Sequence, residues 1–228
     1  MHSLTKYIGG HGTSIGGIVV DGGNFDWIKN RKRQPLLNEP DQSYGGAIWA
    51  DAVPQLTGAN IPFVIRLRVV LLRDTGAPLA PFNAWQIIQG LETVGLRMKQ
   101  HCSNAEKVVT FLETQKKVQN VIYPTNHQGE IKERALKYMK GGYGSLVGMD
   151  VGTKENGAKF IDNLKMLYHV ANIGDARSLA IHPATTTHSQ LNDKELLAAG
   201  VTPGYVRLSV GIEHPDDIIA DIKQALAA

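Results

Sequence analysis

The sequence predicts an α/β protein built from two parts, and three observations lead to this prediction. A short β-branched run at residues 15–21 lies between glycines and indicates a buried strand. Apolar residues recur with helical spacing from about Phe82 to Leu112, which predicts one long helix or two in tandem with a bend near Gly95. Beyond residue 118, short strands and helices alternate.

The first part of the chain contains little regular structure by this interpretation. The stretch from Gly22 to about Ile61 is rich in Asn, Gly, Pro and Gln and reads as a long loop, which is uncommon unless it is functional. Its basic run at 29–33 is typical of a solvated loop face, and a phosphate or nucleic-acid patch is the weaker alternative. Residues 62–75 then predict an amphipathic helix that ends near Gly76.

The later elements follow in order along the chain. Strands are predicted at 118–124, 145–151, 178–183 and 205–213, and helices at 130–139, 155–167 and 214–228. The last helix is the best marked, because Pro215 suits its first position and Asp216 and Asp217 suit its positive end. A helix as long as the one from Phe82 often joins domains, so a domain boundary is expected near residue 95.

Length, composition and net charge exclude several classes of protein. The chain has 228 residues, of which 43% are apolar and 20% charged, with a net charge of +3, so no nucleic-acid partner is expected. No apolar run approaches the length of about 20 residues that a bilayer requires, and no signal peptide is recognised. The lone Cys102 forms no intrachain disulfide and lies on an apolar helical stripe, which predicts a core position in a cytoplasmic protein. The histidines show no metal-ligand spacing, so no metal is expected.

The segment Ser3-Leu-Thr-Lys6 raises the first chemical question. As S-x-x-K it matches an acylating serine motif, but the S-D-N and K-T-G strings that should follow do not occur. The glycines after Tyr7 also disfavour the helix that such a serine would begin. The alternative is a Schiff-base lysine beside hydroxyl groups that hold a phosphate. Composition alone does not distinguish this ligand site from a plain glycine-rich turn.

The full strings are more specific. The segment SLTKYIGGHG at 3–12 resembles the signature of the Cys/Met-metabolism family of pyridoxal-phosphate enzymes. Three further segments resemble that family in the same order: PFNAWQIIQGLETVGLRMKQH, GDARSLAIHPATTTHSQL and VRLSVGIEHPDDIIADIKQAL. Within the family, Gly12-Thr-Ser and the insertion at 24–61 are similar to the O-acetylhomoserine sulfhydrylase branch. The alternatives are a cystathionine γ-synthase or γ-lyase, or a non-catalytic assembly module that pairs with a separate N-terminal half.

The resemblance implies an aspartate-aminotransferase-like (fold type I) α/β chain. Residues 1–95 would be the C-terminal part of the large cofactor domain, and residues 96–228 the small C-terminal α+β domain. The family's ring-stacking aromatic and its aspartate for the pyridine nitrogen lie in a part of the fold that precedes the lysine. The isolated chain is therefore expected to be inactive.

The resemblance also implies the roles of individual residues. Lys6 would carry pyridoxal 5'-phosphate covalently and move protons, while Ser3 and Thr5 would donate hydrogen bonds to its phosphate. Arg207 would grip the substrate α-carboxylate, and Ser178 would orient Lys6 or help bind that carboxylate. The substrate would be an amino acid, and the full-length enzyme a homo-oligomer, either a dimer or a tetramer.

Overall fold

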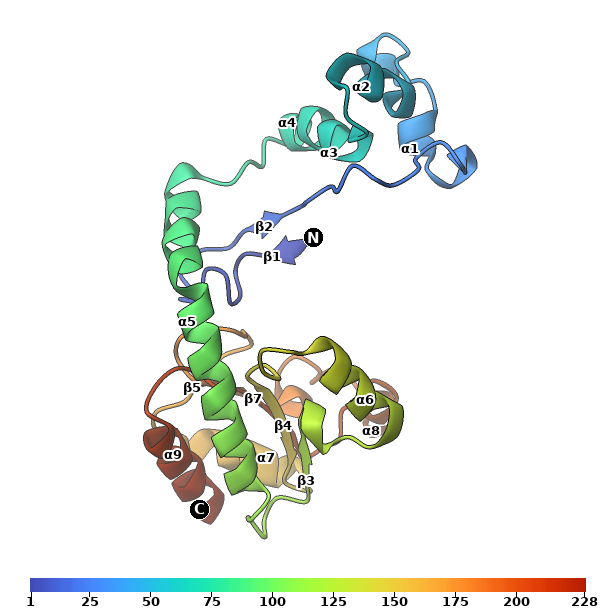
Figure 1. Cartoon of the computed structure of the whole chain (residues 1–228). Coiled ribbons are helices and arrows are strands. Elements are labelled where there is room, and N and C mark those ends of the chain that lie inside the picture. The colour runs from blue at the N-terminus through green and yellow to red at the C-terminus, as the bar shows by residue number, and fades with distance from the viewer. The chain divides into compact units, whose positions relative to one another are not determined.

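The computed structural model describes residues 1–228, which divide into two compact units. The first unit holds residues 1–3 and 16–84, and the second holds 4–15 and 85–228 (Figure 1). The segment around Lys6 therefore belongs to the second unit. The predicted domain boundary near residue 95 lies inside a continuous helix, and a division into domains at that residue stays a prediction.

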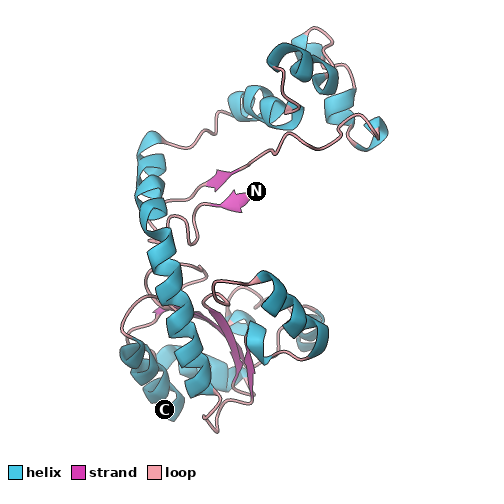
Figure 2. Ribbon diagram, viewed as in Figure 1, coloured by secondary structure: helices cyan, strands magenta, loops and turns pink.

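The second unit is organised around a five-stranded sheet in the order β3-β4-β7-β6-β5 (Figure 2). All neighbouring strands are antiparallel except β5 and β6. The strands are β3 (Asn120–Ile122), β4 (Leu146–Asp150), β5 (Tyr168–His169), β6 (Leu179–Ile181) and β7 (Tyr205–Ser209). The strands predicted at 118–124, 145–151, 178–183 and 205–213 all form, although each is shorter than its predicted range.

One face of this sheet carries the main core. Alternate residues of β4 and β7, such as Val147, Met149, Val206 and Leu208, are fully buried. They form one cluster with side chains from α5 (Pro81–Leu112), α7 (Lys154–Asn163) and α9 (Pro215–Ala227). Because side chains alternate along a strand, Arg207 lies on the opposite face. The core thus fixes which way Arg207 points.

Local signals explain where these helices begin. The side chain of His214 accepts a hydrogen bond from the Asp216 backbone, and Pro215 is the first residue of α9. Thr153 caps α7 in the same way by accepting from Asn156 N. The helix α6 (Gly129–Tyr138) forms as predicted, while α8 (Asp193–Ala198) was missed although Asn192 and Glu195 form a complete capping box.

The long helix α5 is continuous over its 32 residues. Of the two predictions, one helix is observed and a pair bent near Gly95 is not. Cys102 is buried on the inner face of α5, as predicted. An isolated glycine within a helix costs only about 1 kcal/mol, which the packing of the second half of α5 on the sheet outweighs.

The first unit corrects two predictions. The run 15–21 forms only the two-residue strand β2 (Gly17–Ile18), paired with β1 (His2–Ser3), and none of its apolar side chains is buried. No third strand pairs with this ribbon. The predicted loop at 22–61 contains α1 (Pro35–Asn38) and α2 (Trp49–Thr57), with short 3-10 turns at Arg31–Arg33 and Gln42–Tyr44. The glycines and prolines of this segment favour a loop by composition, although both helices form.

A small core holds these helices together. Leu37, Trp49, Ala50 and Val53 are buried in one cluster, and this packing outweighs the cost of Pro54 inside α2. The basic run is exposed, and Arg31 donates two hydrogen bonds to the Asp51 carboxylate.

The predicted helix at 62–75 forms with an irregular centre. It consists of α3 (Pro62–Arg66), a π-helical stretch (Leu67–Leu72) and α4 (Arg73–Thr75), and it ends at Gly76 as predicted. Tyr44 donates its hydroxyl to the Val69 carbonyl at 2.7 Å, within the π-helical stretch. No single helix of the protein is long and apolar enough to cross a membrane; only α2 taken with residues 62–75, a pair bent by 101°, passes on length and composition.

Candidate functional site

The site begins with the turn that carries Lys6. Gly9 N donates to the Leu4 carbonyl and Gly10 N donates to the Lys6 carbonyl, each at 2.8 Å, so the backbone folds back on itself around the lysine. Lys6 itself is half-buried. The positive φ of Gly10 (72°) closes the turn, in a conformation that glycine adopts without strain.

Asn172 connects Lys6 to Arg207. Lys6 Nζ donates to Asn172 Oδ1 at 2.6 Å, and Arg207 Nη2 reaches the Asn172 backbone carbonyl at 3.4 Å. Lys6 makes no ion pair with a carboxylate in this structure, so its amine is held by a neutral amide oxygen. The two residues predicted to hold the cofactor and the substrate carboxylate therefore meet at a third residue that sequence reasoning missed.

The segment between β5 and β6, which contains Asn172, is fastened to the lysine turn at two further points. Ala176 N donates to the Gly10 carbonyl at 2.8 Å. Gly174, with φ of 72°, packs so closely on Tyr7 that a Cβ there would lie 2.7 Å from the Tyr7 nitrogen. These contacts hold Asn172 in register with Lys6, and they also explain why position 174 requires glycine.

Arg207 owes its place to the register of the central strands. It lies opposite Gly148 on β4 and opposite Ile181 on β6. The ring of Tyr205 occupies the space above Gly148, where an added Cβ would lie 2.7 Å from that ring. The half-buried Arg207 therefore projects from the middle of the sheet, on the face away from the main core.

Ser178 is fully buried and has a different set of partners. Its hydroxyl donates to Glu213 Oε2 at 2.9 Å and accepts from Gly211 N at 2.8 Å, and its backbone nitrogen donates to Glu213 Oε1. These bonds tie the residue before β6 to the segment after β7. The Ser178 hydroxyl proton is therefore donated to a carboxylate. The role of Ser178 toward Lys6 or a substrate stays a prediction.

The two predicted phosphate donors fall in different units. Ser3 lies in β1, opposite Gly17, within the first unit. Thr5 lies in the second unit and lines a narrow hollow with the glycine-rich segment 9–14 and with Gln86 of α5. In that hollow Ser14 donates its hydroxyl to Gln86 Oε1 at 2.6 Å. Phosphate binding by Ser3 and Thr5 stays a prediction.

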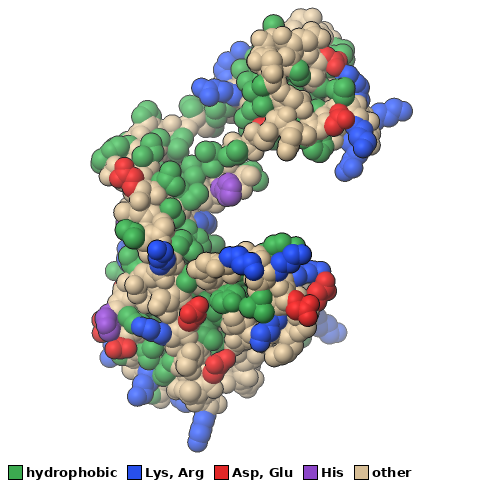
Figure 3. Space-filling view, viewed as in Figure 1, with side chains coloured by type: hydrophobic (Ala, Val, Ile, Leu, Met, Phe, Trp, Pro, Cys, Tyr) green, Lys and Arg blue, Asp and Glu red, His purple; other side chains and the backbone are tan.

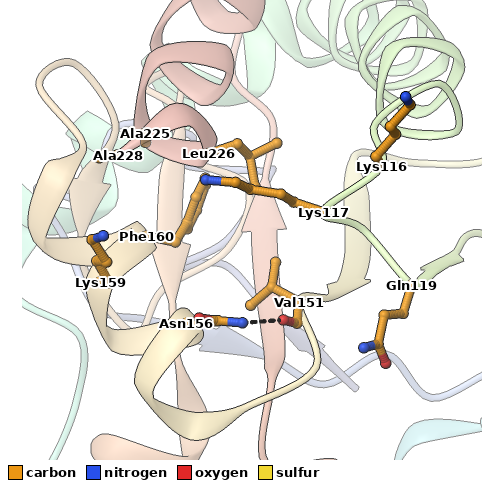
Figure 4. Close-up of a pocket in the computed structure, with 10 residues that line it drawn as sticks. All are labelled: Lys116, Lys117, Gln119, Val151, Asn156, Lys159, Phe160, Ala225, Leu226 and Ala228. Atoms are coloured by element: carbon orange, nitrogen blue, oxygen red, sulfur yellow. Dashed lines mark hydrogen bonds between the residues drawn. The ribbon is translucent and has the colours of Figure 1, made fainter.

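A separate pocket of about 280 Å³ opens near the C-terminal end of α9 (Figure 4). Its floor includes Val151, Phe160 and Leu226, and Lys116, Lys117 and Lys159 surround it. Lys117 donates to the Ala227 carbonyl at 3.3 Å. None of the predicted site residues lines this pocket, so it is not the candidate site.

The arrangement of Lys6, Asn172 and Arg207 fits a covalently held pyridoxal group. A half-buried lysine amine, hydrogen-bonded to an amide and two contacts away from an arginine, can present a nucleophilic nitrogen beside a carboxylate-binding cation. The Lys6, Asn172 and Arg207 side chains all belong to the second unit, which makes this arrangement a property of one compact body.

Known proteins are similar to this chain in sequence and in fold. The chain matches the family described as Cys/Met metabolism PLP-dependent enzyme over residues 1–227. It is 49% identical to an O-acetyl-L-homoserine sulfhydrylase of Leptospira meyeri and 45% identical to a homocysteine synthase of Schizosaccharomyces pombe. Each match covers 99% of this chain and 52% of the relative, so the chain spans about half the length of the curated relatives it matches.

A solved structure gives the same result for the fold. A protein of Campylobacter jejuni described as an O-acetylhomoserine (thiol)-lyase, with an N'-pyridoxyl-lysine-5'-monophosphate, matches with a TM-score of 0.85 and 40% identity. The match covers 100% of this chain and 53% of that one, and it is consistent with an aspartate-aminotransferase-like α/β class. The family match over nearly every residue, joined to the lysine turn that the fold builds, means that this chain belongs to the Cys/Met-metabolism family of pyridoxal-phosphate-dependent enzymes.

Proposed function

We propose that this chain carries the cofactor lysine and the substrate-carboxylate arginine of a γ-replacement enzyme. The substrate is O-acetyl-L-homoserine, and sulfide or methanethiol replaces the acetate to give homocysteine or methionine. The contact of Lys6 with Asn172, and of Asn172 with Arg207, is the observation that supports this most directly. The similarity to proteins named O-acetyl-L-homoserine sulfhydrylase supports this branch over a cystathionine γ-synthase or γ-lyase.

Each residue has a distinct task under this proposal. Pyridoxal phosphate, when bound, supplies a ring that withdraws electrons from the substrate carbon. Lys6 Nζ holds the cofactor and, when released, is the base placed to take the substrate α-proton. Asn172 Oδ1 fixes the direction of the amine by accepting its hydrogen bond. Arg207 offers a planar fork of donors to the substrate carboxylate, a geometry that lysine does not provide.

The 228-residue chain by itself is proposed to bind the cofactor weakly and not to turn over. The family resemblance assigns the aspartate for the pyridine nitrogen to the half of the relatives that this chain does not match. We further propose that residues 1–95 correspond to the end of the large cofactor domain and residues 96–228 to the small domain. The five-stranded sheet, which begins after α5, supports the second assignment.

Covalent trapping tests the role of Lys6. The chain is mixed with pyridoxal phosphate, reduced with borohydride and digested, and the modified peptide is found by mass spectrometry. We expect modification at Lys6 above the level of the other lysines, its loss in Lys6→Ala, and a clear decrease in Asn172→Ala. Lys99→Ala on the exposed side of α5 is the matched lysine control. Equal labelling of all lysines in the folded chain would contradict the proposal.

A second candidate function is favoured by the exposed side of α5. Trp85, Ile88, Leu91 and Leu96 are 52–71% exposed, and Figure 3 shows hydrophobic side chains gathered over this part of the helix. An apolar surface of this kind marks an interface. Because the relatives are about twice as long, we propose that a polypeptide equivalent to their other half covers it.

Co-expression with that half from a relative measures this pairing. A stable one-to-one complex by light scattering is expected, and Ile88→Asp should abolish it while Lys99→Asp, which introduces the same charge at a polar position, should not. Self-association of the chain alone, equally sensitive to Ile88→Asp, would show instead that a second copy covers the surface. Full retention of the complex in Ile88→Asp would rule out this interface.

A further inference from the structure

Arg97 is a buried arginine whose guanidinium has no carboxylate partner. It lies on the inner face of α5 with only 5% of its surface exposed, and it forms no ion pair. Burial lowers the pKa of this guanidinium. Removing a cation from water without a counter-ion is unfavourable unless its donors find acceptors, so the position of Arg97 needs a reason beyond packing.

Its donors bridge the helix and the lysine turn. Nη2 donates to the Ile8 carbonyl at 3.2 Å and to the Gly90 carbonyl at 2.7 Å. Nε donates to Thr93 Oγ1 at 3.2 Å, and Nη1 has no partner. Nη2 alone bridges the helix and the turn, and the Nε contact with Thr93 fixes the plane of the guanidinium so that Nη2 is aimed at both carbonyls. An ammonium is a single point on a flexible chain and lacks this second anchor.

The turn is shaped around this guanidinium. A Cβ at Gly10 would lie 2.0 Å from Arg97 Nη1, so the guanidinium occupies the space that the missing side chain leaves. Gly10 is also the residue whose nitrogen donates to the Lys6 carbonyl. On the other side, a Cβ at Gly90 would lie 2.1 Å from the Gly9 carbonyl oxygen, so helix and turn touch backbone to backbone.

We infer that Arg97 is a positioning residue that holds the lysine turn in the conformation that presents Lys6 to Asn172. It acts through the backbone of residues 8–10 and touches neither Lys6 Nζ nor Asn172. The inference concerns the shape of the turn, and its relevance to catalysis rests on the proposed role of Lys6. Gly10 and Gly90 are the two positions where the device requires the absence of a side chain.

Amide hydrogen exchange measured by NMR on the full chain tests the inference without any cofactor. In Arg97→Met, which keeps the length of the side chain but removes the donors, we expect the Gly9 and Gly10 amides to exchange at least about tenfold faster, the order expected when charged hydrogen bonds are lost. The sheet amides of Val147 and Val206 should not change. Arg134→Met, at an exposed ion pair on α6, is the matched control.

Conservative variants separate positioning from a purely structural role. Arg97→Lys keeps the charge but lacks the fork, so it should leave the turn amides nearly as fast as Arg97→Met does. Added guanidinium ion should slow these amides again in Arg97→Ala and should have no such effect in the wild type. Gly10→Ala keeps the arginine in the sequence but puts a Cβ where its guanidinium lies, so it should have the same effect on exchange at the turn as the loss of the arginine.

Unchanged exchange at Gly9 and Gly10 in folded Arg97→Met and Arg97→Lys would overturn the inference. Accelerated exchange throughout the sheet in both variants would also overturn it, because Arg97 would then support the whole unit. The trapping experiment at Lys6 decides the proposed function separately. Turn amides that depend on Arg97 in a chain whose Lys6 takes no pyridoxal phosphate would leave the inference standing and the proposed function wrong.

Discussion

The two compact units of this chain differ in how their helices are held. The second unit packs three helices on one face of a sheet, around a cluster of nineteen buried residues, whereas the first unit has a cluster of four buried residues and two-residue strands. Each fully buried aliphatic side chain contributes on the order of 1.5–3 kcal/mol, so the larger cluster gives the greater stability. Lys6, Asn172 and Arg207 all belong to the second unit. The candidate site is therefore held by the better-packed of the two units.

The largest expected effect comes from breaking the larger core. Leu208→Ala should lower the free energy of unfolding of the second unit by about 2–5 kcal/mol, because it removes a fully buried side chain from the centre of the sheet. Far-UV circular dichroism in urea measures this transition. Trp27 and Trp49 lie in the first unit and the exposed Trp85 lies in the second, so in a Trp85→Phe background tryptophan fluorescence should report a separate transition at lower urea.

Leu37→Ala is the matched control in the small core. It should move the fluorescence transition and leave the circular dichroism transition nearly in place. Coincident transitions that both variants shift together would show that the two units unfold as one.

Asp221 provides the next largest effect. Its buried carboxylate on α9 accepts from the backbone nitrogens of Lys165, Met166 and Leu167 at 2.9–3.0 Å. Burial acts to raise the pKa of this carboxyl, but the three backbone donors outweigh burial and leave the pKa below its ordinary value. Asp221→Asn should destabilise the second unit by about 1–3 kcal/mol at neutral pH, since it removes a charged acceptor.

The lowered pKa of Asp221 sets the direction in which stability changes with pH. Because the folded-state pKa is lowered, the stabilisation is complete above the unfolded pKa of about 3.9 and is lost as pH falls through the folded value. Urea titrations between pH 7 and pH 2 should therefore show a smaller acid loss in Asp221→Asn than in the wild type. Equal acid loss in both proteins would contradict this assignment.

Two buried histidines should distinguish the units at milder acidity. Burial lowers the pKa of both His101 and His182, which lie in the second unit, whereas the first unit contains only the exposed His2. The unfolded chain therefore binds protons first once pH falls below about 6.5, and the second unit loses stability from there downward. The circular dichroism transition should fall over this range while the fluorescence transition holds.

Replacing one of these histidines checks the cause. His182 Nε2 donates to the Pro203 carbonyl and Nδ1 is hydrogen-bonded to Thr185 Oγ1, and His182→Gln retains a donor and an acceptor at this position. The variant should show a weaker pH dependence between pH 6.5 and 5 than the wild type. An unchanged slope would show that other groups cause the acid loss.

The smallest expected effect concerns the surface of the first unit. Arg31 donates to both oxygens of Asp51, but both side chains are about 40% exposed, and solvent screens such a pair. Arg31→Ala should shift the fluorescence transition less than Leu37→Ala does, and added salt should reduce the difference from the wild type. A shift as large as that of Leu37→Ala would show that the pair, rather than the apolar cluster, holds α1 and α2 together.

Local patterns in the sequence determined a good part of this protein. The caps and periodicity of α9, the alternation in β4 and β7, the helical run at 62–75 and the family signature around Lys6 can all be read within a few residues. Such signals work because capping and side-chain alternation act over one to four residues. They failed at 15–21, where a β-branched run found no sheet to enter, and at 35–57, where buried tryptophan and leucine contacts outweighed glycine and proline.

The tertiary structure alone decided how the site is assembled. Lys6 and Asn172 are 166 residues apart, and their contact follows from the packing of Gly174 on Tyr7 and of α5 on the turn. Ser178, which the motif singles out, hydrogen-bonds to Glu213, 35 residues away. Arg97 reaches the backbone of the lysine turn from α5, a contact that helical periodicity does not predict. A motif can name a residue's chemistry, but which groups surround that residue depends on long-range packing that no local pattern encodes.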